Sequence, residues 1–430
     1  MTVRLDGLQS GMDTTALIQS LIDAERIPFD RKEDQMYKNE QKIYAWSKLD
    51  TKLTTLNSKA VQLNTYSTWQ QKTAGSTTES VVTATANRDA ANGTYAINVT
   101  NLAQSHRIGS TLAISDNTAA LGFSGDFTLG DQTVTIGATD SLNDVRDAIN
   151  DAALNMAEDK KVNATIIGNT LVLERDQTGN TDMVISETAA VAGENNVLRE
   201  LGIVQGDPLS TGTFSTVNNL LQESKDLAAQ INGVDVAASV NTELDSLVEG
   251  VTFNFKDAGS STLTIGTDKA SIKSLITDFI TAYNEAMELS EEASSVNLGS
   301  SSTGEDDAGD VESLGLLQGD LLVGQIRFRA RQTVTALETD PTKMDQDYNT
   351  LTKIGIWTEG QENRLAVVDE DKLDDALENH WDEVEDLFRD FDSGIMRKMV
   401  DYTDGLVSTA DGTVVQHQSK LEAVKQQLER

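Results

Sequence analysis

The sequence predicts an α+β fold: N- and C-terminal helices form a coiled-coil or helical-bundle stalk that carries inserted antiparallel β-rich head domains. Near both ends of the chain, apolar residues recur every three or four positions, which is the period of one face of a helix. Between them lie short runs of β-branched residues separated by turn residues, which is typical of strands. Because both apolar stripes need burial, we expect the two ends to meet and the middle to be an insertion.

The strongest helical signal lies between residues 43 and 63. Its apolar positions are spaced like the a/d seam of a coiled coil, and polar residues fill the positions between them. We expect this stripe to pack inside the chain against helices in segments 268–337 and 395–406. The predicted stalk core is Ile43, Trp46, Leu49, Leu53, Leu56 and Leu63.

The N-terminal segment is predicted to begin as a loop and continue as a helix. Two glycines within residues 7–11 argue against a stable helix there, and Asp13 is a suitable N-cap for the helix that follows. We expect Pro28 to kink or end that helix. The stripe then resumes at residues 36–69, and a continuous helix over residues 30–69 would be about 60 Å long.

From about residue 73 to residue 267 the sequence favours strands, with one short helix among them. Two strands are expected around a turn-rich loop, then two hairpins that flank the helix, then a second β unit. The segments are 80–86 and 93–99 for the strands, 127–136 and 162–174 for the hairpins, 143–153 for the helix and 228–267 for the second unit.

Helical periodicity returns at Asp268 and continues to the C-terminus with one interruption. A further helix is expected near residues 317–337, a hairpin over 354–367, and a short acidic helix that Asp369 caps. The last segment has apolar steps of three and four over 395–406 and again from residue 414 onward.

These period changes divide the chain into five predicted regions. They are an N-terminal leg coil (1–42), a helical stalk domain with a small hairpin (43–72 plus 269–392), a first β head domain (73–108 plus 225–268), a second, inserted β head domain (109–224) and a C-terminal leg coil (393–430).

Charge is distributed unevenly over these regions. The formal net charge is −35, yet residues 1–72 hold ten Lys/Arg against nine Asp/Glu, and residues 393–430 hold five of each. Nearly neutral ends can associate without self-repulsion, while the acidic middle argues against nucleic acid and anionic membrane as partners. No apolar stretch is long enough to span a membrane, and the N-terminus lacks the layout of a cleavable signal peptide.

The sequence offers little for chemistry. It has no cysteine, and its three histidines, His106, His380 and His417, lie in different segments without ligand-like neighbours. The acidic runs at 305–307 and 369–375 lack the pattern of a calcium loop, so a solvated charged face is the favoured interpretation. We therefore expect no catalytic residue, no cofactor and no metal.

The outermost apolar residues are predicted to contact other subunits or partners, because nothing else in the chain is long enough to cover them. These residues are Leu5, Leu8, Met12, Leu17, Leu21, Val414, Leu421, Val424 and Leu428.

Several blocks of sequence resemble one family in the correct order. They are the opening 7–14 with its continuation to Pro28, then 91–106, 141–173, 231–234 with 249–252, 317–320 and 351–371. Together they are similar to the flagellar hook-associated protein 2 family, the filament-capping proteins. Members of that family usually continue further in a C-terminal coil, whereas this chain reaches Arg430.

The resemblance implies a structural homo-oligomer, a pentameric plate on the distal tip of an extracellular bacterial flagellum. It also implies contact with flagellin, whose folding and insertion the plate promotes, and passage through the flagellar export apparatus with a chaperone. Two alternatives keep the same architecture: a hook–filament junction protein or flagellin-like polymerising subunit, and an adhesin role for the exposed β domain (109–224).

Overall fold

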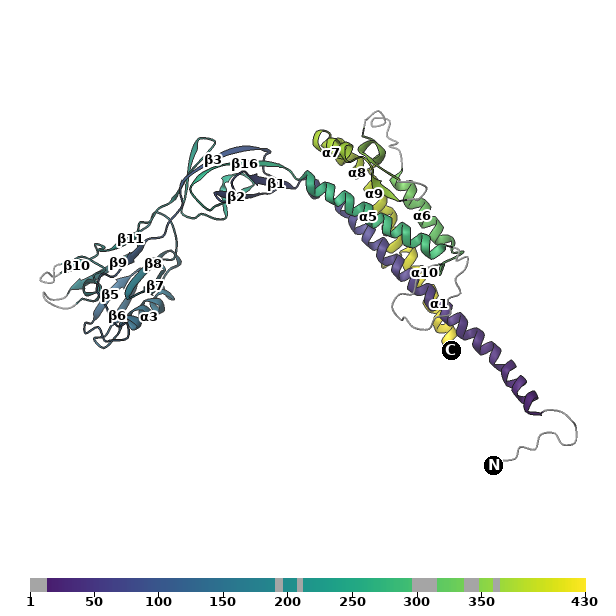
Figure 1. Cartoon of the computed structure of the whole chain (residues 1–430), viewed down its shortest axis with the longest axis horizontal. Coiled ribbons are helices and arrows are strands. Elements are labelled where there is room, and N and C mark those ends of the chain that lie inside the picture. Colours follow the sequence, from purple (N-terminus) through teal and green to yellow (C-terminus); the bar gives the residue numbers. More distant parts are fainter. Residues whose placement is uncertain (1–13, 190–195, 207–211, 296–314, 336–347, 359–363) are drawn as a thin grey trace, which may run out of the picture. The chain divides into compact units, whose positions relative to one another are not determined.

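The computed structural model describes residues 14–189, 196–206, 212–295, 315–335, 348–358 and 364–430 (Figure 1). The chain divides into two compact units. The first, which we call the stalk unit, joins Met1–Gln70 with Asp268–Arg430, and the second, the β unit, is Gln71–Thr267. The finer five-region division stays a prediction. Among the described residues, no helix is long and apolar enough to cross a membrane.

The stalk unit is built around one long helix, α1 (Thr14–Asn64), of 51 residues. At 1.5 Å per residue it is about 75 Å long. Pro28 lies inside it, so the expectation that the helix could end there is wrong. Good helix formers on both sides, such as Glu25 and Lys32, allow helical structure to continue across the one hydrogen bond that proline removes. The predicted loop at 7–11 and the Asp13 cap lie outside the described residues.

Shorter helices surround the C-terminal part of α1. In chain order they are α2 (Tyr66–Trp69), α5 (Lys269–Ser294), α6 (Leu321–Val334), α7 (Glu370–Asn379), α8 (Trp381–Arg389), α9 (Ile395–Val407) and α10 (Thr413–Glu429). A 3-10 turn (Leu351–Ile354) and the hairpin β17 (Ile356–Thr358) and β18 (Leu365–Val367) complete the unit. All of these elements share one hydrophobic core.

The β unit contains two cores. The first lies between a five-stranded antiparallel sheet, in the order β1-β16-β3-β12-β13, and a three-stranded sheet, β14-β15-β2. The strands are β1 (Lys72–Ser76), β2 (Val82–Ala86), β3 (Gly93–Asn101), β12 (Leu227–Ile231), β13 (Val234–Ala238), β14 (Leu244–Val248), β15 (Val251–Phe255) and β16 (Gly259–Thr267). The first and last strands of the β unit pair with each other: β1 lies antiparallel to β16, with Lys72 opposite Thr267.

The second core of the β unit is enclosed by two four-stranded sheets and two helices. The sheets have the orders β10-β9-β5-β6 and β11-β4-β8-β7. The elements are β4 (Arg107–Gly109), β5 (Gly125–Leu129), β6 (Gln132–Ile136), α3 (Leu142–Ala153), β7 (Val162–Ile167), β8 (Thr170–Arg175), β9 (Ile185–Ala189), α4 (Val197–Glu200), β10 (Gly212–Phe214) and β11 (Leu220–Gln222). The hairpins predicted at 127–136 and 162–174 are confirmed as β5–β6 and β7–β8.

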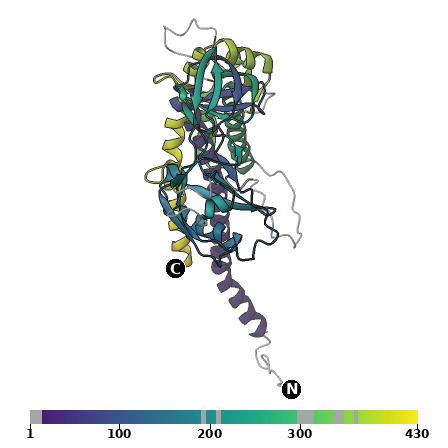
Figure 2. The same cartoon turned by 90° about the vertical axis from the view of Figure 1, so that its left-hand side faces the viewer.

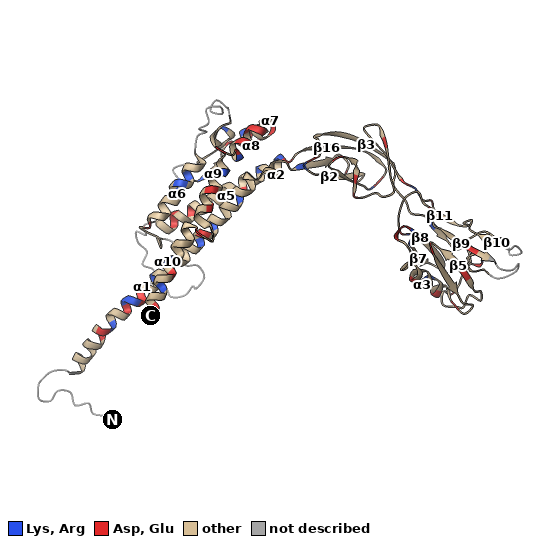
Figure 3. Cartoon of the chain, turned by 180° about the vertical axis from the view of Figure 1, so that it is seen from behind, with Lys and Arg blue, Asp and Glu red and all other residues tan. Residues whose placement is uncertain are grey.

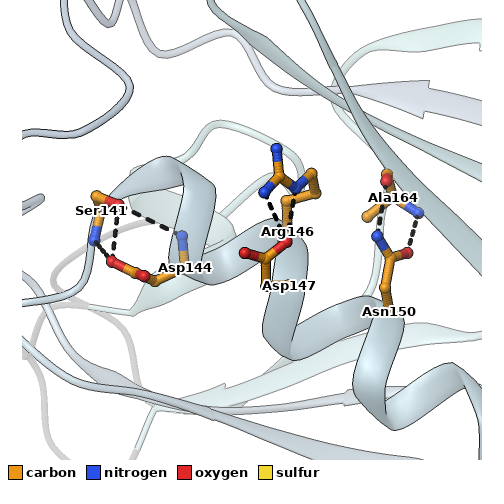
Figure 4. A network of polar contacts seen from close by, with 6 residues as sticks. All are labelled: Ser141, Asp144, Arg146, Asp147, Asn150 and Ala164. Atoms are coloured by element: carbon orange, nitrogen blue, oxygen red, sulfur yellow. Dashed lines mark hydrogen bonds and ion pairs between the residues drawn. The ribbon is translucent and has the colours of Figure 1, made fainter.

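Local polar contacts fix α3 at both ends (Figure 4). Ser141 and Asp144 form a capping box, in which the Asp144 carboxylate accepts from the Ser141 backbone N–H at 2.9 Å. Near the other end, the Asn150 side chain accepts from the Ala164 N–H at 2.8 Å and donates to the Ala164 carbonyl at 3.0 Å. These bonds attach the helix to β7.

Candidate assembly surface

The C-terminal half of α1 is the centre of the stalk core. Five of the six predicted core residues are fully buried: Trp46, Leu49, Leu53, Leu56 and Leu63. Ile43 is half-buried and lines a groove between α1 and α10. Ala45 and Ala60 are also buried on this face.

Ion pairs hold α1 against α5 in an antiparallel arrangement. Lys52 Nζ lies 2.8 Å from Glu285 Oε2, and Lys59 Nζ lies 2.8 Å from Asp278 Oδ2. Because these side chains are partly exposed, each pair contributes at most about 1 kcal/mol. Their main effect is to select the register in which the apolar stripes meet.

Buried amides fix how the C-terminal helices meet α1. Asn39, only 7% exposed, donates from Nδ2 to the Leu421 carbonyl at 2.8 Å. A shift in register would leave this buried amide without its acceptor, so the hydrogen bond favours the observed pairing of α1 with α10. Asn57 donates in the same way to the Asp404 carboxylate of α9.

The start of α10 is anchored in the core. Val414 is fully buried, and the ring of His417 packs against Trp46 with centroids 4.8 Å apart. His417 Nε2 also lies 3.2 Å from Asp320 Oδ2, whose other oxygen caps α6. Farther along, Lys425 Nζ meets Glu40 Oε1 at 3.0 Å, and this hydrogen bond raises the pKa of Lys425. The helices therefore run antiparallel, side by side (Figure 2).

This docking corrects the prediction for Val414. It was assigned to subunit contacts because no other part of the chain was expected to be long enough to cover it, but it is buried among residues of its own chain. Leu421 is half-buried and packs against the same core. Helix α10 continues along α1 in the direction of α9, since Asp404 lies at Asn57 and His417 at Trp46, and the beginning of α10 completes the bundle.

The N-terminal half of α1 is an exposed apolar surface. Every side chain in residues 15–31 is exposed, including Leu17 (57%) and Leu21 (60%). At the far end of α10, Val424 is exposed and Leu428 half-buried. The other three residues predicted for assembly, Leu5, Leu8 and Met12, lie outside the described residues.

Large apolar side chains on this exposed segment form one broad face of the helix. Ile18, Ile22 and Phe29 join Leu17 and Leu21, and Phe29 is 73% exposed. Residues 14–38 hold five acidic and four basic side chains, so the segment has almost no net charge. An exposed, nearly neutral apolar helix can bind other helices without electrostatic repulsion.

Other buried polar groups of the stalk unit belong to the core. Burial raises the pKa of Tyr402 to about 12, and it also raises the pKa of the Tyr283 phenol and of the Glu385 carboxyl. Asp50 of α1 also has its pKa raised by burial. None of these groups lies in a cluster of metal ligands, since no such cluster of His, Asp or Glu occurs in the described part of the chain.

Sequence reasoning missed the polar contacts that position α10. Asn39 lies four residues before Ile43, at a seam position of the same stripe, and this spacing could have revealed it. The pairing of His417 with Asp320 had no such signal, because the two residues are far apart in the sequence and come together only in the fold.

The architecture defines a class of protein: a structural subunit whose two chain ends form a helical stalk and whose middle forms β domains. Sequence profiles of the flagellar hook-associated protein 2 C-terminus and N-terminus match residues 224–430 and 10–106. Together these two matches cover more than half of the chain. The chain belongs to the flagellar hook-associated protein 2 family.

Similar proteins agree with this assignment. The A-type flagellar hook-associated protein 2 of Pseudomonas aeruginosa is 25% identical over 92% of this chain and 82% of its own length. The flagellar hook-associated protein 2 of Escherichia coli K12 is 28% identical over 86% of this chain and 77% of its own.

The fold is also similar to a solved structure, that of the D1-D2-D3 domains of the flagellar cap protein FliD from Escherichia coli. The TM-score is 0.59 at 24% identity, and the match covers 88% of this chain and 99% of that one. This likeness supports the shared fold of stalk and inserted β domains.

Proposed function

We propose that this protein is the structural cap of a bacterial flagellar filament, located outside the cell at the distal tip. The observation that supports this function is the family match at both ends of the chain, the same segments that build the stalk. The cap is a homo-oligomeric plate that promotes the folding and insertion of exported flagellin and prevents its loss.

The exposed part of α1 provides the surface for this role. In the capping function, the apolar residues of segment 15–31 contact neighbouring copies or flagellin, with Val424 and Leu428 at the side of α10. A helix with a broad face of exposed apolar side chains, such as Leu21 and Phe29, needs at least one partner helix to cover it. The assignment of Leu5, Leu8 and Met12 to the same contacts extends this surface toward the N-terminus.

The finer features of the assembly belong to the same proposal. The plate is a pentamer, and the chain reaches the tip through the flagellar export apparatus with the help of a chaperone. The absence of cysteine suits such a route, because no disulfide has to form after export. Neither nucleic acid nor membrane is a partner.

The role is structural rather than catalytic. Each histidine has a partner that explains its position: His106 accepts from the Met183 N–H at 3.0 Å, His380 stacks on Tyr348, and His417 pairs with Asp320. We infer that these side chains support the fold and that the protein needs no cofactor.

Complementation of a strain that lacks its own cap protein tests the function. Expression of this chain should restore swimming in soft agar and reduce the amount of flagellin monomer in the medium. If flagellin continues to be lost although the chain is exported, the capping function is wrong.

Electron microscopy separates capping from the alternatives. Purified protein should form closed plates, and antibody label should lie at the filament tip. Open tubes would support a flagellin-like polymerising subunit, while label at the hook would support a junction protein. The adhesin role of residues 109–224 is a separate proposal, which a binding assay with the isolated segment on host surfaces would test.

A further inference from the structure

One face of helix α6 packs in the core of the stalk unit, and another face is exposed. Val323, Ile326 and Ala330 are buried on one side of the helix. On another side, Leu321 is 81% exposed and Phe328 68% exposed. These two residues are seven positions apart, so they lie about two turns from each other on the same face.

Positive charge surrounds this exposed aromatic residue. Helix α6 contains three arginines and no acidic residue, in a chain of net charge −35. Arg327 and Arg329 flank Phe328, and neither side chain forms an ion pair within the part of the chain that the structure describes. We call Leu321, Arg327, Phe328 and Arg329 the α6 patch. Exposed aromatic and arginine side chains are the types most enriched at the centre of protein interfaces.

A groove of opposite character lies elsewhere on the stalk unit, between the start of α5 and α7. It has a volume of about 520 Å³, and Ala270 and Leu377 provide its apolar lining. Its rim carries the carboxylates of Asp374, Asp375 and Glu378 and the amino groups of Lys269 and Lys273. Figure 3 shows the contrast, with blue basic residues on α6 and red acidic residues on α7.

Part of the acidic charge on α7 is not neutralised within the chain. Lys273 pairs with Asp374 at 2.6 Å, and Lys269 pairs with Glu378 at 2.9 Å. By contrast, Asp371 and Asp375, one turn apart on the exposed side of α7, form no ion pair among the described residues, although Asp375 accepts from Asn379 at 2.8 Å. These two carboxylates can therefore pair with incoming arginines.

We propose that the α6 patch of one copy docks in the α5–α7 groove of a second copy. Phe328 contacts the apolar lining of the groove, and Arg327 and Arg329 pair with Asp371 and Asp375. Every copy carries one patch and one groove, so identical copies satisfy both surfaces by associating head to tail. Such a heterologous contact generates a ring when the rotation between copies closes. The inference rests on the self-association in the proposed function and names a surface for it.

Charge reversal in the full-length chain tests the pairing. Arg327→Glu with Arg329→Glu should lower the association constant at least tenfold in sedimentation experiments, and Asp371→Arg with Asp375→Arg should do the same. All four changes in one chain restore opposite charges and should restore assembly. Lys256→Glu, an exposed change in the β unit, is the matched control and should keep the wild-type mass.

Disulfide trapping provides a second measurement that does not depend on charge. Because the chain has no cysteine, cysteines introduced at Gln325, beside Phe328, and at Asn379, in the groove, are the only thiols. Gln325→Cys with Asn379→Cys should give a ladder of covalent oligomers on oxidation, and neither single variant should give more than a trace of dimer.

The outcomes distinguish this inference from the proposed function. If wild-type protein stays monomeric at every concentration, the proposed self-association fails and the interface with it. If wild-type protein assembles but the reversed variants assemble equally well, or Gln325→Cys alone forms dimers efficiently, only the α6–α7 contact is overturned. Each variant must give the same circular dichroism melting curve as the wild type. A variant that does not is replaced by Phe328→Ser.

Discussion

The two halves of α1 have similar sequence patterns but opposite surroundings. Leu53 in the C-terminal half is fully buried, whereas Leu21 in the N-terminal half is 60% exposed. Both residues belong to stripes with steps of three and four. The difference arises from the rest of the chain, because α5, α9 and α10 cover only the C-terminal half. A stripe in the sequence therefore indicates that a helix needs a partner, without indicating whether its own chain provides one.

Among variants of the two halves of α1, the largest loss of stability is expected from a charge at the centre of the buried half. Leu53→Asp should lower the free energy of unfolding of the stalk unit by about 4 kcal/mol, because it removes buried apolar contacts and buries a carboxylate without a partner. Circular dichroism melts would then show a fall in Tm of at least about 8 °C. Leu21→Asp is the matched control in the exposed half, and equal melts for the two variants would contradict the comparison.

A smaller effect is expected at the buried amide of the seam. Asn39→Ala should cost about 1 kcal/mol of unfolding free energy, since the side-chain hydrogen bond from the buried Asn39 to the Leu421 carbonyl is lost. Gln19, whose amide bonds to Asp23 at 2.9 Å on the exposed half, is the control. Urea unfolding of both alanine variants measures the difference, and a cost at Gln19 as large as that at Asn39 would refute the assignment.

The stability of the protein should depend on pH through Asp50 in the buried half of α1. Burial raises the pKa of this carboxyl, so ionisation opposes folding, and the penalty is fully present above the folded-state pKa. This penalty disappears as the pH falls toward about 3.9, the pKa of an aspartate side chain in the unfolded chain. Asp50→Asn should therefore stabilise the protein at pH 7, and the gain should vanish by about pH 3.5.

Unfolding curves at several pH values test this expectation. Asp30→Asn, on the exposed half, should change stability by no more than about 0.5 kcal/mol at any pH. A gain for Asp50→Asn that is independent of pH would show that the ionised carboxylate is not the cause.

The smallest change in stability is expected from the exposed leucines. Leu17→Ser with Leu21→Ser should alter the unfolding free energy of the monomer by less than about 0.5 kcal/mol, because both side chains are already in water. Assembly should nevertheless fall, and light scattering at matched concentrations would detect it. An unchanged oligomer mass would show that this surface does not take part in assembly.

Features that depend on local sequence were predictable. The alternation of β-branched residues located the hairpins at 127–136 and 162–174, and Asp369 was predicted as a cap that the structure places at the start of α7. Such signals need no knowledge of distant residues, because turn and cap geometry is decided within a few positions.

Features that depend on distant pairing were not predictable. Val414 and Val424 belong to one apolar repeat, yet the first is buried and the second exposed. Likewise, the prediction assigned the segments 93–99 and 228–267 to one β head domain but gave no strand order, and in the sheet β3 lies between β16 and β12. Periodicity identifies a face that needs a partner, whereas the partner depends on the whole topology.

The pairing of β1 with β16 has a consequence for the order of folding. Lys52 and Glu285 are 233 positions apart, so their contact requires the closure of a long loop of unfolded chain. Once β1 and β16 are paired, Lys72 and Thr267 are adjacent, and the end of α1 and the start of α5 each lie only a few residues from this pair. The entropy cost of bringing the helices together then falls by on the order of 1–2 kcal/mol. Early pairing of β1 with β16 is therefore expected to speed the assembly of the bundle.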